Sequence, residues 1–458
     1  MEPVALATDP HATRWEVDVT RVHELRERWD LIKPRGGLRT LLPTLDRAAT
    51  IDDLRRLAKL RTPRPVFDYV DGAAEAERSM LRNEGSFADV VFRPHVLRDV
   101  SSVDPTWTVL GSPSALPFGF APTGFTRMMH TDGELAVGRV AASLGIPYGL
   151  STVGTTTPEE LAAELPHLRR WFQLYVWRDR GPTRAFVERA REAGFEALIL
   201  TVDVPVAGAR MRDVRNGLTL PPTPSLRTFL QGALHPAWSR DFLTKPPVRF
   251  ASLETGFEGT AGSFIDRMFD PTVTFDDIEW VRSLWSGKIV VKGVQRIDDA
   301  ERLAAIGVDA IVVSNHGGRQ LDRTLAPLAL LPIVRERLDG RVEVWVDGGV
   351  RAGSDVVAAI GLGAQFVLVG RAYLYGLMAG GERGVAVAGR ILADGVTRTM
   401  ALLGIRSFDE LESDMVAPSR EAALAAEAAT ASTRPRARRS RRIMASPSET
   451  NPTPAASD

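Results

Sequence analysis

Short apolar runs recur along the chain from about residue 115, and each is followed by a segment with helical periodicity. Runs of this length that end in glycine or polar residues are typical of buried strands. The eight runs are Leu116–Pro122, Ile146–Val153, Trp171–Val176, Ala197–Asp203, Lys288–Val294, Ala310–His316, Val342–Gly349 and Phe366–Arg371. The amphipathic, alanine-rich segments between them include Gly133–Leu144, Pro182–Ala193, Asp298–Ile306 and Gly353–Leu362.

This alternation of strand and helix predicts an α/β protein with a parallel sheet. No dinucleotide-binding fingerprint follows the first run, and the Gly361–Gly363 stretch is better interpreted as the end of a helix. Eight strand–helix units without that fingerprint favour a (β/α)8 TIM barrel over a doubly wound sheet.

The segments outside the repeat divide the chain further. Residues 1–50 are predicted to form an N-terminal arm with a helix near Val19–Trp29, and Thr50 is a good N-cap for the helix that follows. Residues 51–418 would form the barrel domain, with a long loop after its fourth strand, at about residues 210–275. We expect this loop to act as a lid, with contact to a membrane or partner as the alternative.

Residues 419–458 are alanine-rich, then basic, then rich in serine and proline, which predicts a disordered tail. Its Arg434–Arg442 cluster has the composition of a segment that touches acidic lipid or nucleic acid, although a solvated tail is the preferred interpretation.

Composition narrows the class of protein. The formal net charge is zero and 44% of residues are hydrophobic, as in a globular enzyme, and nothing in this balance predicts a nucleic-acid partner. Without cysteine, the chain has no disulfides, thiolate metal ligands or cysteine nucleophile. We expect no metal, and neither a signal peptide nor a membrane span is evident, so a cytoplasmic location or a peripheral one on the membrane's inner face is predicted.

The strongest chemical signal is the stretch from Ser314 to Asp322, which directly follows an apolar run. His316 is able to exchange a proton near neutral pH, and Arg319 has the planar fork that binds a carboxylate. A turn in which the histidine bonds only to backbone is the alternative, so the interpretation depends on which other groups converge here.

In a barrel, the carboxyl ends of all strands face one common site. Here nearly every predicted strand end carries polar or glycine residues. Those ends supply Thr123, Ser151, Gln173, Tyr175, Thr201, Asp203, Arg210, Lys292, His316, Arg319, Asp347, Gly349, Arg351, Gly370 and Arg371. The loops after the seventh and eighth strands are the usual phosphate site of this fold, and their glycines and arginines imply a phosphorylated cofactor.

Five motifs carry a resemblance to a known family. They are Ser314–Asp322, Phe172–Tyr175, Thr201–Asp203, Val291–Gly293 and Asp347–Gly349, and the similarity extends over about residues 50–415. The chain resembles the FMN-dependent α-hydroxy-acid dehydrogenases and oxidases, which include glycolate oxidase, lactate oxidase and mandelate dehydrogenase. The segments Gly208–Arg210, Arg212–Gly217 and His235–Trp238 are similar to the bacterial respiratory L-lactate dehydrogenase branch, particularly its actinobacterial form.

The resemblance implies a role for each matching residue. His316 would be the base that takes a proton from the substrate, and Asp203 would stabilise its protonated form. The substrate carboxylate would be held by Arg210, Arg319 and Tyr69, and its hydroxyl side by Tyr175. Lys292 would stabilise the reduced flavin. The remaining cofactor contacts would come from Thr123, Ser151, Gln173, Thr201, Ser314, Asp347, Gly349, Arg351, Gly370 and Arg371.

The implied reaction is oxidation of an L-2-hydroxy acid, L-lactate above all, with electrons passed to a quinone or another diffusible acceptor. The resemblance leaves hydride and carbanion routes open and implies a homotetramer. Val153 replaces the tryptophan of glycolate oxidases, and Gly124 stands where oxidases often have alanine. The alternatives are a peroxide-producing oxidase, an FMN enzyme acting on a peptide or isoprenoid, and a flavin-binding barrel without turnover.

Overall fold

A computed structural model describes residues 28–29, 44–217, 226–245 and 269–418. The chain forms two compact units, Met1–Arg47 and Ala48–Asp458. In the first, the described residues include the short 3-10 helix η2 (Leu45–Arg47). The helix predicted near Val19–Trp29 falls outside the described residues except at 28–29, which are helical, and the predicted tail of residues 419–458 falls outside them entirely.

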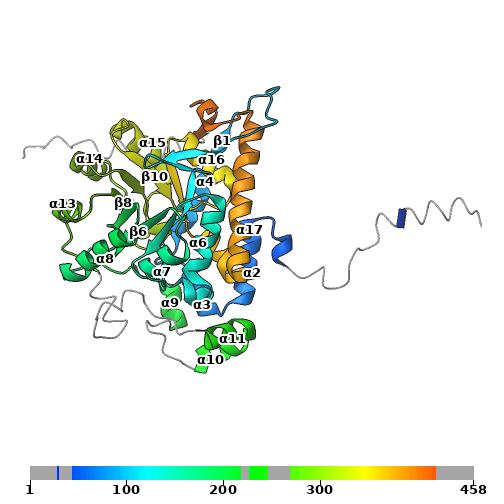
Figure 1. Cartoon of the computed structure of the whole chain (residues 1–458). Coiled ribbons are helices and arrows are strands. Elements are labelled where there is room, and N and C mark those ends of the chain that lie inside the picture. Colours follow the sequence, from blue (N-terminus) through cyan, green and yellow to red (C-terminus); the bar gives the residue numbers. More distant parts are fainter. Residues whose placement is uncertain (1–27, 30–43, 218–225, 246–268, 419–458) are drawn as a thin grey trace, which may run out of the picture. The chain divides into compact units, whose positions relative to one another are not determined.

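The second unit contains a closed barrel of eight parallel strands, which confirms the predicted fold (Figure 1). Each strand pairs with its neighbours in sequence order, and the last closes onto the first. Each predicted run coincides with one strand, although β6 begins one residue before its run. The strands are β4 (Phe118–Phe120), β5 (Tyr148–Ser151), β6 (Arg170–Leu174), β7 (Ala197–Thr201), β8 (Lys288–Val294), β9 (Ala310–Val313), β10 (Glu343–Asp347) and β11 (Phe366–Val369).

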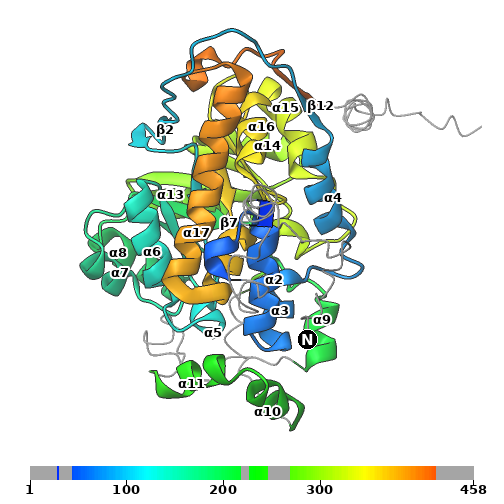
Figure 2. The ribbon, with the colours of Figure 1, turned by 90° about the vertical axis from the view of Figure 1, so that its right-hand side faces the viewer.

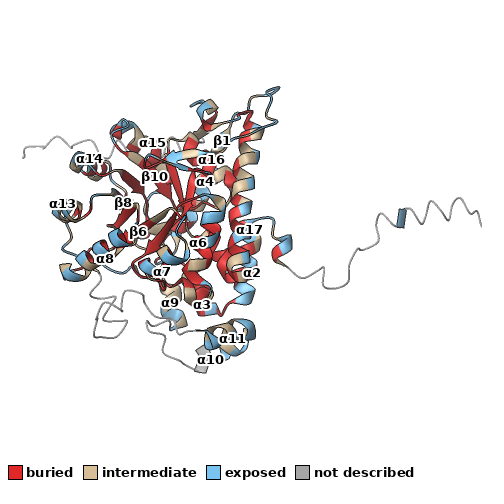
Figure 3. Cartoon of the chain, viewed as in Figure 1, coloured by how far each residue is buried: buried red, intermediate tan, exposed pale blue. Residues whose placement is uncertain are grey.

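The barrel interior is built in layers, because side chains two residues apart on a strand point the same way. A buried layer contains Trp171, Trp345 and Phe366, whose rings pack with centroids 5.0 to 5.6 Å apart. Both indole nitrogens donate to carboxylates, those of Glu196 and Glu343. Polar residues lie two positions further toward the carboxyl ends: Gln173 and Asp347 follow Trp171 and Trp345, and Thr201, Lys292 and Ser314 follow the buried Ile199, Val290 and Val312. Figure 3 shows this buried sheet at the centre of the unit.

The predicted helices are also confirmed. They are α6 (Gly133–Leu144), α8 (Arg180–Glu192), α14 (Ile297–Ile306) and α16 (Gly353–Gly361). Thr50 caps α2 (Ile51–Arg61) as predicted, and together with Asp53 it forms a capping box. The other covering helices are α4 (Arg78–Ala88), α5 (Thr126–Met129), α7 (Pro158–Glu164), α13 (Phe275–Leu284) and α15 (Pro327–Leu338). Two small two-stranded antiparallel sheets pair β1 (Val90–Phe92) with β12 (Val416–Pro418) and β2 (Trp107–Val109) with β3 (Ser112–Ser114).

The segment after β7 differs from the predicted loop. Its described part contains three short helices: α9 (Met211–Asn216), α10 (Leu226–Ala233) and α11 (Pro236–Thr244). Pro236 begins α11, where its fixed φ and missing N–H suit a first turn. Tertiary contacts hold α11, since Trp238 Nε1 donates to the Met128 carbonyl at 3.2 Å and Asp241 accepts from Thr131. No described helix is long and apolar enough to cross a bilayer.

The helix α17 (Arg371–Leu403) closes the unit and packs along α2 (Figure 2). Gly380 and Gly381 interrupt its helical backbone, and Gly381 has a φ of 56°. The two parts then approach each other so closely that a Cβ on Gly384 would lie 1.9 Å from the Gly376 carbonyl oxygen. Only glycine fits at this contact.

We predict that Gly384→Ala lowers the free energy of unfolding by about 1–3 kcal/mol, because its methyl group overpacks a backbone contact. Gly85→Ala is the matched control: it lies in α4 with no atom within 4 Å of its added Cβ. That control should raise the free energy by about 0.5–1 kcal/mol. Urea denaturation measures both, and equal shifts in the two variants would contradict the close contact.

Candidate active site

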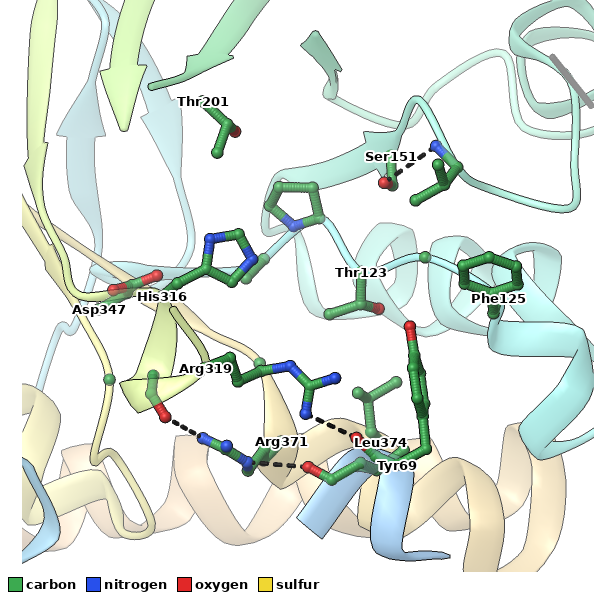
Figure 4. Close-up of a pocket in the computed structure, with 18 of the residues that line it drawn as sticks. Tyr69, Thr123, Phe125, Ser151, Thr201, His316, Arg319, Asp347, Arg371 and Leu374 are labelled. Carbon is green, nitrogen blue, oxygen red and sulfur yellow. Dashed lines mark hydrogen bonds between the residues drawn. The ribbon is translucent and has the colours of Figure 1, made fainter. Parts of the chain in front are cut away.

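A cavity of about 400 Å³ opens at the carboxyl ends of the barrel strands (Figure 4). It brings together nearly all of the residues predicted from the sequence. The lining includes Tyr69, Thr123, Ser151, Gln173, Tyr175, Thr201, Arg210, Lys292, His316, Arg319, Asp347, Gly349, Arg351, Gly370 and Arg371. Asp203 and Ser314 do not line the cavity and instead lie behind residues that do.

Asp203 orients the histidine. His316 Nδ1 lies 3.0 Å from Asp203 Oδ1, so the carboxylate accepts the Nδ1 proton and leaves Nε2 as the basic nitrogen. The His316 backbone has a φ of 56°, and its N–H donates to Ser314 Oγ at 3.0 Å. Asp203 follows β7 and His316 follows β9, so two strand ends fix this pair.

The Asp203 carboxyl is ionised despite its burial. Burial by itself would raise its pKa, but His316 and Lys292 lower it, and the net pKa lies below the ordinary value. Among the described residues, Asp203 Oδ2 is buried without a hydrogen-bond partner. Gly293 allows this packing, because a Cβ there would lie 2.7 Å from the Asp203 side chain.

Lys292 places a buried positive charge at the base of the cavity. Its side chain is 6% exposed, and Nζ lies 2.9 Å from Asp347 Oδ2 and 3.0 Å from Ser314 Oγ. Burial would lower the lysine pKa, but Asp347 and Asp203 more than offset this, and the net pKa is raised. The ammonium group therefore stays charged and can stabilise negative charge that develops beside it.

Arg210, Arg319 and Tyr69 form a cationic corner in the wall of the cavity. The guanidinium groups of Arg319 and Arg210 lie 5.0 and 5.9 Å from the centre of the Tyr69 ring. Burial, together with the nearby charge of Arg210, lowers the pKa of Arg319 to about 9. Arg210 Nε is buried without a partner among the described residues. Asp213, in the same cavity, interacts with both arginines, and the two guanidinium groups still exceed this one carboxyl, which suits the carboxylate of a small acid.

Tyr175 and a row of polar side chains complete the walls. Burial raises the pKa of Tyr175, so its hydroxyl keeps its proton. Across the neighbouring strands β5, β6 and β7, Ser151 Oγ donates to Gln173 Oε1 at 3.1 Å, and Gln173 Nε2 donates to Thr201 Oγ1 at 3.1 Å. This row offers donors and acceptors along one line, as the edge of a flat heterocycle requires.

The ends of β10 and β11 form a glycine-lined recess. Gly349 has a φ of 96°, and a Cβ there would lie 2.4 Å from the Asn83 carbonyl oxygen. A Cβ on Gly370 would meet no protein atom within 4 Å, so the space beside it is open. Exposed backbone amides and open space beside glycines are what a phosphate group needs.

The two arginines predicted for this recess are already bonded to protein. Arg371 donates from all three guanidinium nitrogens to the carbonyls of Val70, Gly72 and Gly317 at 2.7 to 2.9 Å. Because these carbonyls are neutral, the charge of Arg371 is not cancelled. Arg351 instead pairs with Glu84 at 2.6 Å. The arginines thus position the recess as well as lining it.

Several lining or supporting residues were not predicted. Phe125, Met129, Phe269 and Leu374 line the cavity and lie outside the segments that carry the resemblance. Asp213 also lines it and lies in one of those segments, Arg212–Gly217, but no role was predicted for it. Glu134 is fully buried in α6 and accepts from Thr155 N–H at 2.7 Å, which holds the loop after β5. The amphipathic pattern of α6 gave no sign that one of its carboxylates points inward.

The cavity fits a phosphorylated, flat cofactor. Its volume, the open space at Gly370 and the buried, unpartnered Asp347 Oδ1 all leave room and bonding capacity for one. A barrel with this cofactor recess, a buried lysine and a histidine–aspartate pair beside two arginines defines a flavin-dependent class of oxidoreductase. The FMN-dependent dehydrogenase profile matches residues 58–418, and the chain belongs to that family.

Individual relatives agree with the family. A Mycobacterium tuberculosis protein with the provisional name L-lactate dehydrogenase is 53% identical over 86% of this chain and 94% of its own length. The L-lactate dehydrogenase of Caulobacter vibrioides is 43% identical over 80% of this chain and 96% of its own. The crystal structure of the monotopic membrane protein (S)-mandelate dehydrogenase has a TM-score of 0.78 and 36% identity, covering 81% of this chain and all of that one. The protein is therefore an FMN-dependent enzyme that oxidises a small 2-hydroxy acid.

We predict that Gly370→Ala weakens FMN binding about tenfold or more, because its methyl group would enter the open space of the recess. Folding should be unaffected, since no protein atom lies within 4 Å of that methyl position. Fluorescence titration of the apoprotein with FMN measures the affinity. Gly85→Ala serves again as the control, and wild-type affinity in Gly370→Ala would exclude the recess as the phosphate site.

Proposed function

We propose that the enzyme oxidises L-lactate to pyruvate and passes the electrons to a quinone or another diffusible acceptor. The observation that carries this proposal is the His316–Asp203 pair at 3.0 Å, in the same cavity as the Arg210–Arg319 corner and Lys292. Two relatives named L-lactate dehydrogenase, each covering more than nine-tenths of its own length, support the choice of substrate.

In this proposal each residue of the site has a separate role in binding or in proton transfer. Arg210 and Arg319 bind the substrate carboxylate with Tyr69, and the Tyr175 hydroxyl bonds to the substrate's oxygen at C2. His316 Nε2 then removes a proton from the substrate, and Asp203 stabilises the resulting imidazolium. FMN, held by the cofactor-binding residues named from the sequence, would supply the acceptor for the two electrons. Lys292 places a positive charge where the reduced cofactor would carry negative charge.

The residues that line the active-site cavity limit the size of the substrate that it accepts. Gly124 packs against Val153 so closely that an added Cβ would lie 2.3 Å from Val153 Cγ2. Phe125, Met129 and Leu374 add an apolar lining. This lining also favours a second candidate, a larger aromatic 2-hydroxy acid, as the names of the mandelate dehydrogenase and mandelate oxidase neighbours suggest.

We also propose peripheral contact with the inner face of the cell membrane through the segment after β7. Leu234 and Leu243, in or beside α10 and α11, are 73% and 79% exposed. Exposed leucines on short interfacial helices are typical of proteins that lie on a bilayer. The monotopic mandelate dehydrogenase supports this placement by its name. The homotetramer and the identity of the acceptor stay predictions from the resemblance.

We predict that L-lactate bleaches the flavin absorbance of the anaerobic holoprotein, and that readmitted air restores it slowly. In His316→Gln the rate of bleaching should fall by about 10²–10⁴-fold, because the proton acceptor is lost. His95→Gln, at a 40% exposed histidine outside the cavity, is the matched control. Stopped-flow absorbance measures the rates.

The other outcomes separate the alternatives. Fast reoxidation with peroxide would make the enzyme an oxidase, and bleaching by mandelate but not by lactate would favour the larger substrate. If no 2-hydroxy acid bleaches the flavin, the proposed turnover is wrong and a binding role replaces it.

We predict that the holoprotein floats with bacterial-lipid vesicles at low salt, and that replacing Leu234 and Leu243 by serine reduces the floating fraction at least about threefold through lost apolar burial. Leu81→Ser in α4, at a 61% exposed leucine, is the control. If the wild-type protein stays at the bottom of the gradient, the membrane contact is wrong.

A further inference from the structure

Two short helices separate the active-site cavity from a second cavity. They are α3 (Arg64–Asp71) and α9, which contact each other (Figure 2). From α3, Tyr69 and Val70 line the active-site cavity, and Phe67, Asp68 and Asp71 line the second cavity. Likewise α9 lends Asp213 and Val214 to one side and Arg212, Arg215 and Asn216 to the other. The two cavities share no lining residue.

The second cavity is large, and its lining is rich in cationic side chains. Its volume is about 630 Å³, in the range of sites for small metabolites. Five cationic side chains from three helices line it: Arg55, Lys59, Arg64, Arg212 and Arg215. Asp68 and Asp71 are the two carboxylates of the lining, against five cations. Two further carboxylates outside the lining, Glu77 and Asp52, pair with Arg212 and Arg55.

Both carboxylates of the lining are already engaged by the protein. Asp71, whose side chain is 3% exposed, accepts from Arg55 Nε at 2.5 Å, from an Arg212 nitrogen at 2.8 Å and from the Tyr375 hydroxyl at 2.9 Å. Asp68 accepts from Arg64 Nε at 3.2 Å and from Asn216 Nδ2 at 2.8 Å. Their hydrogen-bonding capacity is therefore largely used within the cavity wall.

Two of the cations, Lys59 and Arg64, have capacity left for a ligand. Lys59 has no hydrogen bond or ion pair with any described residue. Arg64 is 67% exposed and uses one nitrogen on Asp68, which leaves its outer nitrogens free to donate. Thr62 and His235 also line the cavity, and their side chains bond to the backbone carbonyls of Ala58 and Gln231.

We propose that this cavity binds the phosphate group of a phosphorylated compound other than the cofactor. Arginine forks and a lysine ammonium are the groups that proteins use for phosphate, and two arginines alone would serve a single carboxylate. Phe67 gives the lining an apolar surface for the remainder of the compound. A soluble metabolite and a phospholipid headgroup share this chemistry.

Inorganic pyrophosphate is the probe for the test, titrated calorimetrically into the full-length, FMN-loaded protein at constant ionic strength. Saturating pyruvate keeps the probe out of the arginine corner of the active site. In the Lys59→Gln/Arg64→Gln variant the affinity should fall at least about tenfold, because two charged donors are lost. Arg56→Gln is the matched control: it is 69% exposed on the same helix, pairs with Asp52 and does not line the cavity.

Several outcomes would overturn the proposal. Absence of binding, unchanged affinity in the double variant, or an equal loss in Arg56→Gln, meaning an adventitious ion only, would each do so. If the double variant also loses binding to phosphatidylglycerol vesicles, the phosphate comes from lipid; if it keeps that binding, the source is soluble. The experiment measures binding alone, and Lys59 and Arg64 lie outside the active-site cavity. A failure of the proposed lactate oxidation is therefore distinguishable from a failure of this proposal.

Discussion

The chemistry of the site depends on one buried cation. Lys292 lies inside the barrel, 2.9 Å from Asp347, and its charge helps to keep Asp203 ionised. Asp203 in turn holds His316 in the tautomer that leaves Nε2 basic. Without Lys292, two carboxylates would be buried near each other with little compensation, and one would take up a proton. The parallel strands lower the entropic cost of assembling this cluster, because they hold its members in place on a rigid frame.

A second set of cations attaches the helix α3 to the barrel. Arg319 donates to the carbonyls of Tyr69 and Gly72, and Arg371 donates to those of Val70 and Gly72. These carbonyls lie at the carboxyl end of α3, where the helix dipole favours positive charge. The same arginines therefore face the cavity and fix the helix that carries Tyr69, so the binding corner and its support form one unit.

Much of the fold and most of the site could be predicted, because both follow from local patterns. The apolar runs predicted the barrel strands β4 to β11. Residues at the ends of these strands, such as His316 and Lys292, converge in any closed barrel. The helices after β7 could not be predicted, since α11 depends on distant contacts such as Trp238 with the Met128 carbonyl. Asp213 lines the cavity on α9, which packs against the distant helix α3. The buried position of Glu134 cannot be read from the amphipathic pattern of α6.

The partition made by α3 and α9 has an evolutionary consequence. Neither helix belongs to the repeating barrel units: α3 precedes the first barrel strand, and α9 lies in the segment after β7. The reacting groups, by contrast, stand on or directly after barrel strands. In the proposed mechanism, mutations in the two helices would therefore alter the wall that contacts the acid and leave His316, Asp203 and Lys292 in place. Substrate preference would then change separately from the redox chemistry.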